Sequence, residues 1–318
     1  MVDLRPTFFY PPFAYSYFLL VATVAVRSNQ KMEKKLNRLS DLIPHAEARL
    51  TETGIPRVFM SQSKISLDQI FMVQEPTINL IVRGSKTMTI GGQVLCCYSG
   101  TYFALPVEIP ISGIVNPDAG GQSYLSVSLR LNSKVIADLF FDMPEFQASE
   151  GMKREVSIAK ATAPFLDAWI RMLNLMDTPQ DIPALAPVYE REILYRVLQG
   201  PMGWMLQDLV SPESILARIN SAIKYISCYF EQPIRIESLA ERSAMSVSAF
   251  YRHFKRVTSL SPIQYQKKIR LFKARTLLLT TGMNITLIAH KVGYESSAQF
   301  TREYHREFGF PPSKDLRA

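Results

Sequence analysis

Histidine and cysteine are scarce in this chain, and most metal centres need them. Only four of the 318 residues are histidine and three are cysteine. Metal sites cluster such residues with carboxylates at short spacing. The histidines are His45, His253, His290 and His305, and none lies in the part of the chain whose pattern indicates β-strands. We therefore expect no metal site and no cofactor.

Catalytic motifs are missing as well. The sequence contains no G-x-S-x-G elbow, no P-loop and no G-x-G-x-x-G. These short motifs position nucleophiles and phosphates in common enzyme folds. An enzyme is therefore the least favoured class of protein, and we expect no catalytic residue.

The three cysteines are too few for a disulfide framework. Cys96 and Cys97 are adjacent, so on a strand they point to opposite faces and pair poorly. A reducing cytoplasm fits this cysteine usage. We interpret the cysteines as small apolar filler. The alternative is a thiol that senses an electrophile or an oxidant.

A long apolar run is confined to the beginning of the chain. Residues 13–26 are apolar apart from Ser16 and Thr23, but a membrane-spanning helix needs about 20 such residues. We expect residues 1–31 to be a leader outside the functional fold, with translation starting at Met32. The alternatives are a packed or disordered extension and a membrane anchor.

Positive charge is concentrated in the last third. Residues 212–318 carry 17 lysines and arginines against 8 acidic residues, whereas the rest of the chain has a net charge of −1. A basic surface attracts phosphate groups because binding releases counterions. The charge therefore indicates a nucleic-acid partner, unless it is only a generic basic surface.

One pattern occurs twice in this basic third. Ile234–Ser259 and Asn284–Gly309 each read as a short helix, a turn and a second helix that opens at a serine cap, Ser246 or Ser296. This is the helix-turn-helix pattern, whose second helix enters the major groove of DNA. Two copies predict sequence-specific binding to double-stranded DNA.

A helical stretch, Pro262–Thr280, separates the two copies. A helix of roughly 18 residues spans about 27 Å at 1.5 Å per residue. Successive turns of the major groove lie about 34 Å apart. The stretch therefore has a suitable size for a rigid spacer helix between two reading helices.

On these features, residues 215–318 resemble the DNA-binding domain of the AraC/XylS family of bacterial transcription regulators. The matching residues are Leu239, Ala240, Met245, Ser246, Phe250, Arg252, Phe254 and Lys255 in the first copy, Pro262, Tyr265, Arg270, Leu271, Ala274, Arg275, Leu277 and Leu278 in the spacer, and Ile285, Ile288, Ala289, Val292, Gly293, Tyr294, Phe300, Arg302, Tyr304, Phe308, Gly309 and Pro312 in the second copy. After Pro312 the chain reads SKDLRA, where the family usually has an aromatic residue and arginine.

The resemblance also implies which side chains meet DNA. The family's base-facing positions fall on Ser248, Tyr251 and Arg252 in the first copy, and on Ser297, Gln299 and Arg302 in the second, with Thr301 nearby. Arginine can pair with guanine, and glutamine with adenine, through two hydrogen bonds. Each of these residues could instead contact phosphate or solvent. We expect the DNA backbone to be neutralised by Lys255, Arg256, Lys267, Lys268 and Arg306.

The first two thirds show a different pattern. Short runs rich in β-branched and aromatic residues lie between residues 58 and 131 and are separated by Gly, Pro, Asn and Asp. They predict an antiparallel barrel or double-sheet roll, with a hairpin at Gly91-Gly92. Helical periodicity follows from Ser133 onward.

Residues 40–200 resemble the N-terminal sensor domain of one branch of the same family, a cupin-like barrel followed by helices. The matching residues are Glu75, Pro76, Gly84, Lys86, Gly100, Tyr102, Pro106, Arg191, Glu192, Ile193, Leu194, Gly200 and Pro201.

We therefore predict an α+β protein with four segments. They are a leader (1–31), a cupin-like sensor or dimerisation domain (32–205), a linker (206–214) and a DNA-binding domain with two helix-turn-helix units joined by a spacer helix (215–318). The expected function is a cytoplasmic transcription regulator that binds promoter DNA and contacts RNA polymerase. A small-molecule effector and a homodimer are further expectations, and the sequence pattern does not identify effector-binding residues. The alternatives are an N-terminal domain that only dimerises and a membrane-tethered regulator.

Overall fold

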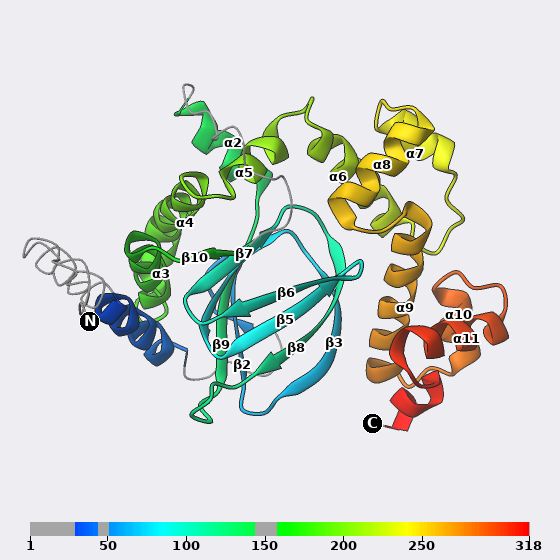
Figure 1. The fold of residues 1–318 in the computed structure, drawn as a ribbon, viewed down its shortest axis with the longest axis horizontal. Helices are drawn as coiled ribbons and strands as arrows, with labels where there is room; N and C mark the ends of the chain where they lie inside the picture. Colours follow the sequence, from blue (N-terminus) through cyan, green and yellow to red (C-terminus); the bar gives the residue numbers. More distant parts are fainter. Residues whose placement is uncertain (1–28, 44–50, 144–157, 318) are drawn as a thin grey trace, which may run out of the picture.

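Two antiparallel sheets face each other in the first half of the chain (Figure 1). The computed structural model describes residues 29–43, 51–143 and 158–317. One sheet has the strand order β1-β2-β9-β4-β7-β10, and the other has the order β3-β8-β5-β6. The strands are β1 (Thr51–Glu52), β2 (Val58–Ser63), β3 (Leu67–Gln74), β4 (Thr77–Arg83), β5 (Ser85–Ile90), β6 (Gln93–Tyr98), β7 (Thr101–Leu105), β8 (Ile109–Asn116), β9 (Tyr124–Arg130) and β10 (Ile158–Lys160). We refer to these two sheets as the barrel.

The local predictions for the strands are confirmed. Ile90 pairs with Gln93 across the Gly91-Gly92 turn, so β5 and β6 form the expected hairpin. Cys97 is buried and Cys96 exposed, as adjacent residues of a strand should be, and all three cysteines are free. Burial raises the pKa of the Cys97 thiol to about 12. The buried thiol therefore stays protonated, which disfavours a role in oxidant sensing.

The six-stranded sheet has two chemically different faces. Its outer face is apolar and packs on helices, with the Tyr102 ring 4.6 Å from that of Phe165. Its inner face looks toward the other sheet, because Lys86 Nζ of β5 lies 5.5 Å from the centre of the Phe103 ring. Asn79 and Ser128 are paired side by side in this sheet and share the inner face with Phe103. The barrel interior is therefore partly polar.

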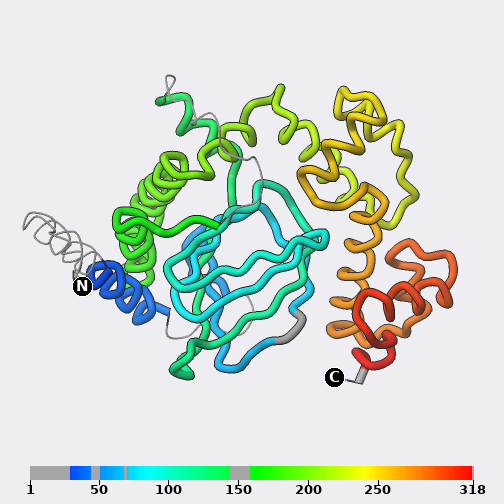
Figure 2. The backbone as a smooth tube through the Cα atoms, in the orientation of Figure 1, coloured from blue at the N-terminus to red at the C-terminus, as the bar shows by residue number. Residues whose placement is uncertain are grey.

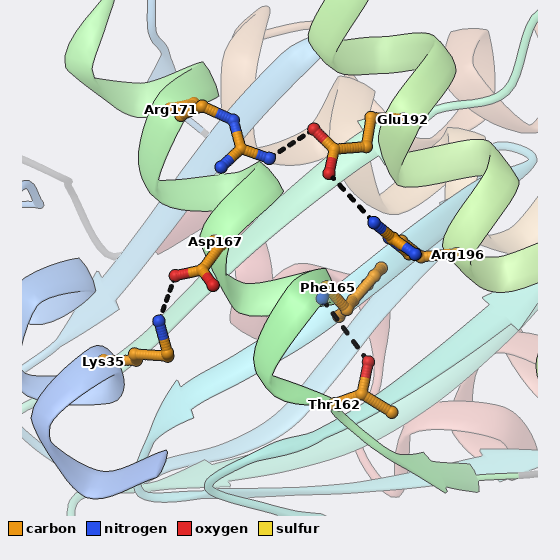
Figure 3. A network of polar contacts seen from close by, with 7 residues as sticks. All are labelled: Lys35, Thr162, Phe165, Asp167, Arg171, Glu192 and Arg196. Carbon is orange, nitrogen blue, oxygen red and sulfur yellow. Dashed lines mark hydrogen bonds and ion pairs between the residues drawn. The ribbon is translucent and has the colours of Figure 1, made fainter. Parts of the chain in front are cut away.

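Helices cover the outer face of that sheet. They are α2 (Ser133–Phe141), α3 (Ala163–Asn174), α4 (Ile182–Leu198) and α5 (Gly203–Val210), preceded by a helix over residues 29–41. Figure 3 shows the ion pairs that connect them: Lys35 with Asp167, and Arg171 with Glu192. The helix over 29–41 is therefore held against α3.

The predicted leader (1–31) lies outside the described residues, except for residues 29–31, which begin this helix. The apolar run at 13–26, on which the membrane-anchor alternative depends, is among the residues left undescribed. Within the described part of the chain, every helix is too short or too polar to cross a membrane.

The predicted linker is helical in its first half. Residues 206–210 belong to α5, because Leu206 and Leu209 are buried against the other helices. Only Ser211–Ser214 separate α5 from α6 (Ile215–Cys228). The domain boundaries stay predictions.

The remaining chain is helical and follows the predicted order. It contains α7 (Ile236–Arg242), α8 (Val247–Thr258), α9 (Pro262–Thr280), α10 (Ile285–Lys291), α11 (Ser297–Phe308) and the 3₁₀ helix η2 (Pro312–Arg317). The bounds of α9 are those predicted for the spacer helix. Ser261 sets its start, since its side chain and that of Gln264 form a capping box. The predicted fold class is confirmed.

The barrel packs against the spacer helix (Figure 2). Phe71 of β3 lies edge-on against Phe272 of α9 and Phe308 of α11, with ring centres 5.7 and 4.8 Å apart. The hydroxyl of Tyr265 donates a hydrogen bond of 2.8 Å to the Glu108 carbonyl. These contacts join the barrel to α9 and α11, residues far apart in the sequence.

Candidate nucleic-acid interface

Two helix-turn-helix units lie at the two ends of α9 (Figure 1). In each unit a serine caps the second helix: Ser246 Oγ accepts from the Ala249 amide, and Ser296 Oγ from the Gln299 amide, both at 3.3 Å. A side-chain oxygen at this position satisfies an amide that the first turn would leave unpaired. The two caps fix where α8 and α11 begin and therefore which residues face outward.

On α8 the predicted reading residues form one exposed stripe. Ser248, Tyr251 and Arg252 are all exposed, and Lys255 follows on the same face at helical spacing. Arg256 is exposed beside them. No hydrogen bond or ion pair with a described residue holds the Arg252 guanidinium, so it is free to reach a base edge.

On α11 the stripe is narrower. Gln299, Arg302 and Arg306 are exposed at helical spacing, whereas Ser297 is half-buried. Thr301 is also half-buried, and its hydroxyl donates to the Ser297 carbonyl at 2.9 Å. Ser297 and Thr301 are thus the least accessible of the predicted base-facing residues.

His305 is an exposed residue that the sequence reasoning did not select. It lies three residues after Arg302, one helical turn along the same face. The 3.6-residue period of α11 was the signal that could have identified it.

Aromatic side chains hold both reading helices down. On α8, Phe250 and Phe254 are fully buried, and Phe254 meets Tyr265 of α9 edge-on at 5.5 Å. On α11, Phe300, Tyr304 and Phe308 are buried in the same way. Because each apolar face is covered, the opposite face of each helix is directed to solvent.

Arg270 of α9 connects the two units. Its guanidinium donates to the carbonyls of Phe230 (2.7 Å), Glu231 (3.0 Å) and Gln232 (3.1 Å) before α7, and to the Gly293 carbonyl (2.9 Å) in the turn of the second unit. A methyl group at Gly293 would lie 2.1 Å from the Glu231 carbonyl oxygen. The turn of the second unit therefore packs directly on the loop before the first.

Lys267 and Lys268, predicted to contact phosphate, are engaged in ion pairs. Lys267 Nζ lies 2.9 Å from Glu303 of α11, and Lys268 pairs with Glu307. Burial alone would raise the pKa of Glu303. The hydrogen bonds that it accepts from Lys267 and Tyr294 outweigh burial and hold the pKa below its ordinary value. The two lysines thus hold α11 against α9.

The departure from the family pattern after Pro312 is also accounted for. Asp315 of η2 is buried and accepts hydrogen bonds from the Tyr304 hydroxyl and, at 3.0 Å, from Arg275 Nε. The Asp315 carboxylate therefore connects η2 to α9 and α11. In the described ranges, no group of three or more histidine, cysteine or acidic side chains is arranged to hold a metal ion.

Comparison with known proteins agrees with this geometry. Residues 54–205 match the family described as AraC-type transcriptional regulator N-terminus, and residues 239–318 match a helix-turn-helix domain family. The chain is 32% identical over 143 residues to the HTH-type transcriptional activator RhaS of Escherichia fergusonii, covering 45% of this chain and 50% of RhaS. It is 36% identical over 115 residues to the regulator AlkR of Acinetobacter baylyi, covering 36% of each. The chain thus spans half or less of these relatives.

Solved structures show the same fold. Fatty-acid-bound ToxT from Vibrio cholerae superposes with a TM-score of 0.52 at 11% identity, covering 81% of this chain and 94% of ToxT. The named relatives are regulators, which agrees with the expectation that the chain is not an enzyme. Two matched family regions, covering the barrel with its helices and the paired helix-turn-helix units, place this chain in the AraC/XylS family of transcription regulators.

Proposed function

We propose that this protein binds promoter DNA in a sequence-specific way and regulates transcription under the control of a small molecule. One observation carries the proposal. Arg252 and Arg302 are exposed at the same position of two capped helices, six residues after Ser246 and Ser296, and α9 holds those helices in a fixed relation. Two such helices suit two turns of the major groove.

The individual roles follow from accessibility. Arg252 and Arg302 read guanine, Gln299 reads adenine, and Ser248 and Tyr251 contact base edges or sugar–phosphate. Gln299 donates to Glu303 at 3.4 Å, so its amide must leave that partner to pair with a base. Ser297 is half-buried, so it is the least accessible to a base of the six predicted reading residues.

Exposed Lys255, Arg256 and Arg306 are the favoured phosphate contacts. Lys267 and Lys268 would have to leave their glutamate partners to join them.

The sign and setting of regulation are part of the proposal. RhaS is named an activator, which supports activation through contact with RNA polymerase in the cytoplasm. The ToxT crystals include one with a bound unsaturated fatty acid, which supports effector control. An N-terminal part that only dimerises is the alternative, and the polar barrel interior favours a sensor.

Selection of genomic DNA fragments by the purified full-length protein tests the proposal. Footprinting of the enriched fragments should show two protected segments about 10 base pairs apart, centre to centre. The Arg252→Ala, Arg302→Ala double variant is the control and should lose the enrichment. Equal recovery of all fragments by the wild-type protein would refute sequence-specific binding.

A further inference from the structure

Lys86 is a buried lysine on the inner side of the barrel. It lies on β5 with 8% of its surface exposed. No hydrogen bond or ion pair to a described residue reaches its ammonium group. A buried lysine is normally paired, since an isolated charge is costly to remove from water. Within the residues that the structure describes, this ammonium group is therefore left without a hydrogen-bonded or ionic partner.

Among the described residues, the contacts of Lys86 include an aromatic face but no carboxylate. Lys86 Nζ lies 5.5 Å from the centre of the Phe103 ring. Its cross-strand neighbours are Cys97 on β6 and Val115 on β8. Burial lowers the pKa of Lys86 to about 8, and the Cys97 thiol opposes the shift only in part. The ammonium group is therefore still largely protonated at pH 7.

A second unsatisfied polar group lies on the facing sheet. Asn79 is 5% exposed, and its Oδ1 has no hydrogen-bond partner among the described residues. Asn79 is paired with Phe103 on one side and with Ser128 on the other. Cross-strand neighbours lie about 5 Å apart, so Lys86, Phe103, Asn79 and Ser128 belong to one region of the interior.

Ser128 of this region also lines a pocket of the barrel. This pocket of about 210 Å³ is lined by inward-facing side chains that include Met72, Thr77 and Ser128. Arg130 lies at its rim, stacked 4.6 Å from the centre of the Phe59 ring and paired with Glu75. Ser128 lines the pocket and is also paired with Asn79, whose other cross-strand neighbour is Phe103 beside Lys86.

We propose that the barrel interior binds a small molecule carrying an anionic group, which pairs with Lys86 Nζ while Asn79 and Ser128 bind its polar atoms. A carboxylate and a phosphate monoester share the chemistry that this arrangement recognises. The inference rests on the proposed function only in taking the barrel as the sensing part.

Thermal unfolding of the full-length protein tests the site. The probes are sodium hexanoate, sodium benzoate and glycerol 2-phosphate, with hexanamide and benzamide as neutral counterparts. A bound anion at 100 times its Kd should raise the melting temperature by about 5–10 °C. The same shift is expected in Lys160→Met, which removes an exposed lysine of β10, and it should be absent in Lys86→Met and Lys86→Gln.

The pattern of responses shows whether the bound group is a carboxylate or a phosphate, and whether it binds at Lys86. A response to the carboxylates alone or to the phosphate alone identifies the anionic group. A shift that survives in both Lys86 variants, a response to the amides only, or no response of the wild-type protein to any anion would overturn the site. DNA binding is measured in the same wild-type samples, so a protein that binds an anion but no DNA would refute the regulatory function and leave the site standing.

Discussion

At the scale of single residues, Arg252 and Arg302 carry the expected sequence recognition. Both guanidinium groups are exposed and have no intramolecular partner in the described chain. An arginine that pairs with guanine contributes about 1–3 kcal/mol of discrimination. A contact to phosphate contributes to all sequences alike.

Replacing Arg302 with alanine should therefore cost about 1–3 kcal/mol on the selected DNA site and relax the preference at one base position. Arg306→Ala is the matched control, because it removes an exposed arginine of the same helix. It should weaken binding to all sequences and reduce the salt slope by about one. Quantitative binding to a set of single-base variants at two salt concentrations measures both effects. A uniform loss for Arg302→Ala would assign that residue to phosphate.

Lys86→Met should stabilise the protein in the absence of ligand. The unfolded chain keeps the Lys86 proton up to about pH 10.5, whereas the folded protein loses it near pH 8. Below pH 8 the folded state therefore bears the full cost of the buried charge. Between pH 8 and 10.5 the stability of the wild-type protein rises with pH through this group, and the advantage of the methionine variant fades.

The expected gain is on the order of 3 kcal/mol at pH 7 and should be small at pH 10. Cys97 interacts electrostatically with Lys86, and Tyr124 with Cys97. Burial raises the pKa of both groups, so both stay protonated in the folded state over this window. Urea unfolding of wild type, Lys86→Met and Lys160→Met at the two pH values measures the difference. A less stable Lys86→Met at pH 7 would mean that the ammonium group has a stabilising partner in the protein.

Residue roles could be predicted from the sequence only in part. The exposed stripe of α8 follows from the cap at Ser246 and the helical period, so its members were correctly placed on the surface. The pairing of Lys267 with Glu303 joins residues 36 positions apart, and no local pattern indicates it. The unpaired state of Lys86 depends on which strands face each other, which the alternation of residues along β5 does not reveal.

At the scale of elements, the turn of the second helix-turn-helix unit has no room for a side chain. Gly293 adopts a φ of 89°, and an added Cβ would lie 2.1 Å from the Glu231 carbonyl oxygen. Gly309 has a similar φ of 82° but nothing within 4 Å of such an atom. Substitution of Gly309 therefore tests backbone strain alone, whereas substitution of Gly293 tests backbone strain together with a steric clash.

Gly309→Ala should cost about 1 kcal/mol, the usual price of a left-handed conformation for alanine. Gly293→Ala should cost roughly 3 kcal/mol or more, because the loop at Glu231 must also move. Chemical unfolding followed by circular dichroism measures both losses. Footprinting should show that Gly293→Ala weakens protection of the half-site contacted by α11. Equal destabilisation by the two substitutions would show that the Glu231 loop yields without cost.

The bounds of two elements, α9 and the β5–β6 hairpin, could be predicted from the sequence. Ser261-Pro262 provides the cap and first residue of α9, and Gly91-Gly92 provides the turn between β5 and β6, so both follow from residue chemistry. The link between units through Arg270 could not be predicted, since its acceptors are backbone carbonyls. Any residue supplies a carbonyl, so residue identity carries no signal for that contact.

At the scale of the whole molecule, contacts of β3 and β8 join the barrel to the helical part of the chain. Phe71 contacts Phe272 and Phe308 edge-on. The Arg275 guanidinium stacks on the Phe71 ring, 4.8 Å from its centre. At the other end, an atom added to Gly91 of the hairpin would lie 2.4 Å from Ser259, at the end of α8. The barrel thus touches both helix-turn-helix units.

Phe71→Ala should uncouple the two parts. We expect the wild-type protein to unfold in one calorimetric transition, and the variant to show two transitions or a lower melting temperature of the helical part, because the aromatic contact is lost. Phe141→Ala is the control, since that phenylalanine is 84% exposed on α2. An unchanged single transition in Phe71→Ala would show that the remaining contacts are sufficient for coupling.

Strand β3 bears a consequence for protein engineering. Successive side chains alternate, so Met72 lines the barrel pocket while Phe71 packs against α9 and α11. A biosensor could therefore be built by fusing the barrel to a different pair of helix-turn-helix units. The new units would need aromatic residues that contact Phe71, as Phe272 and Phe308 do, and a small residue beside Gly91, as Ser259 is. Insertions at the other loops of the barrel would leave that junction intact. A single residue added within β3 would exchange the two faces of the strand on one side of the insertion and disrupt the contact of Phe71 with α9 and α11.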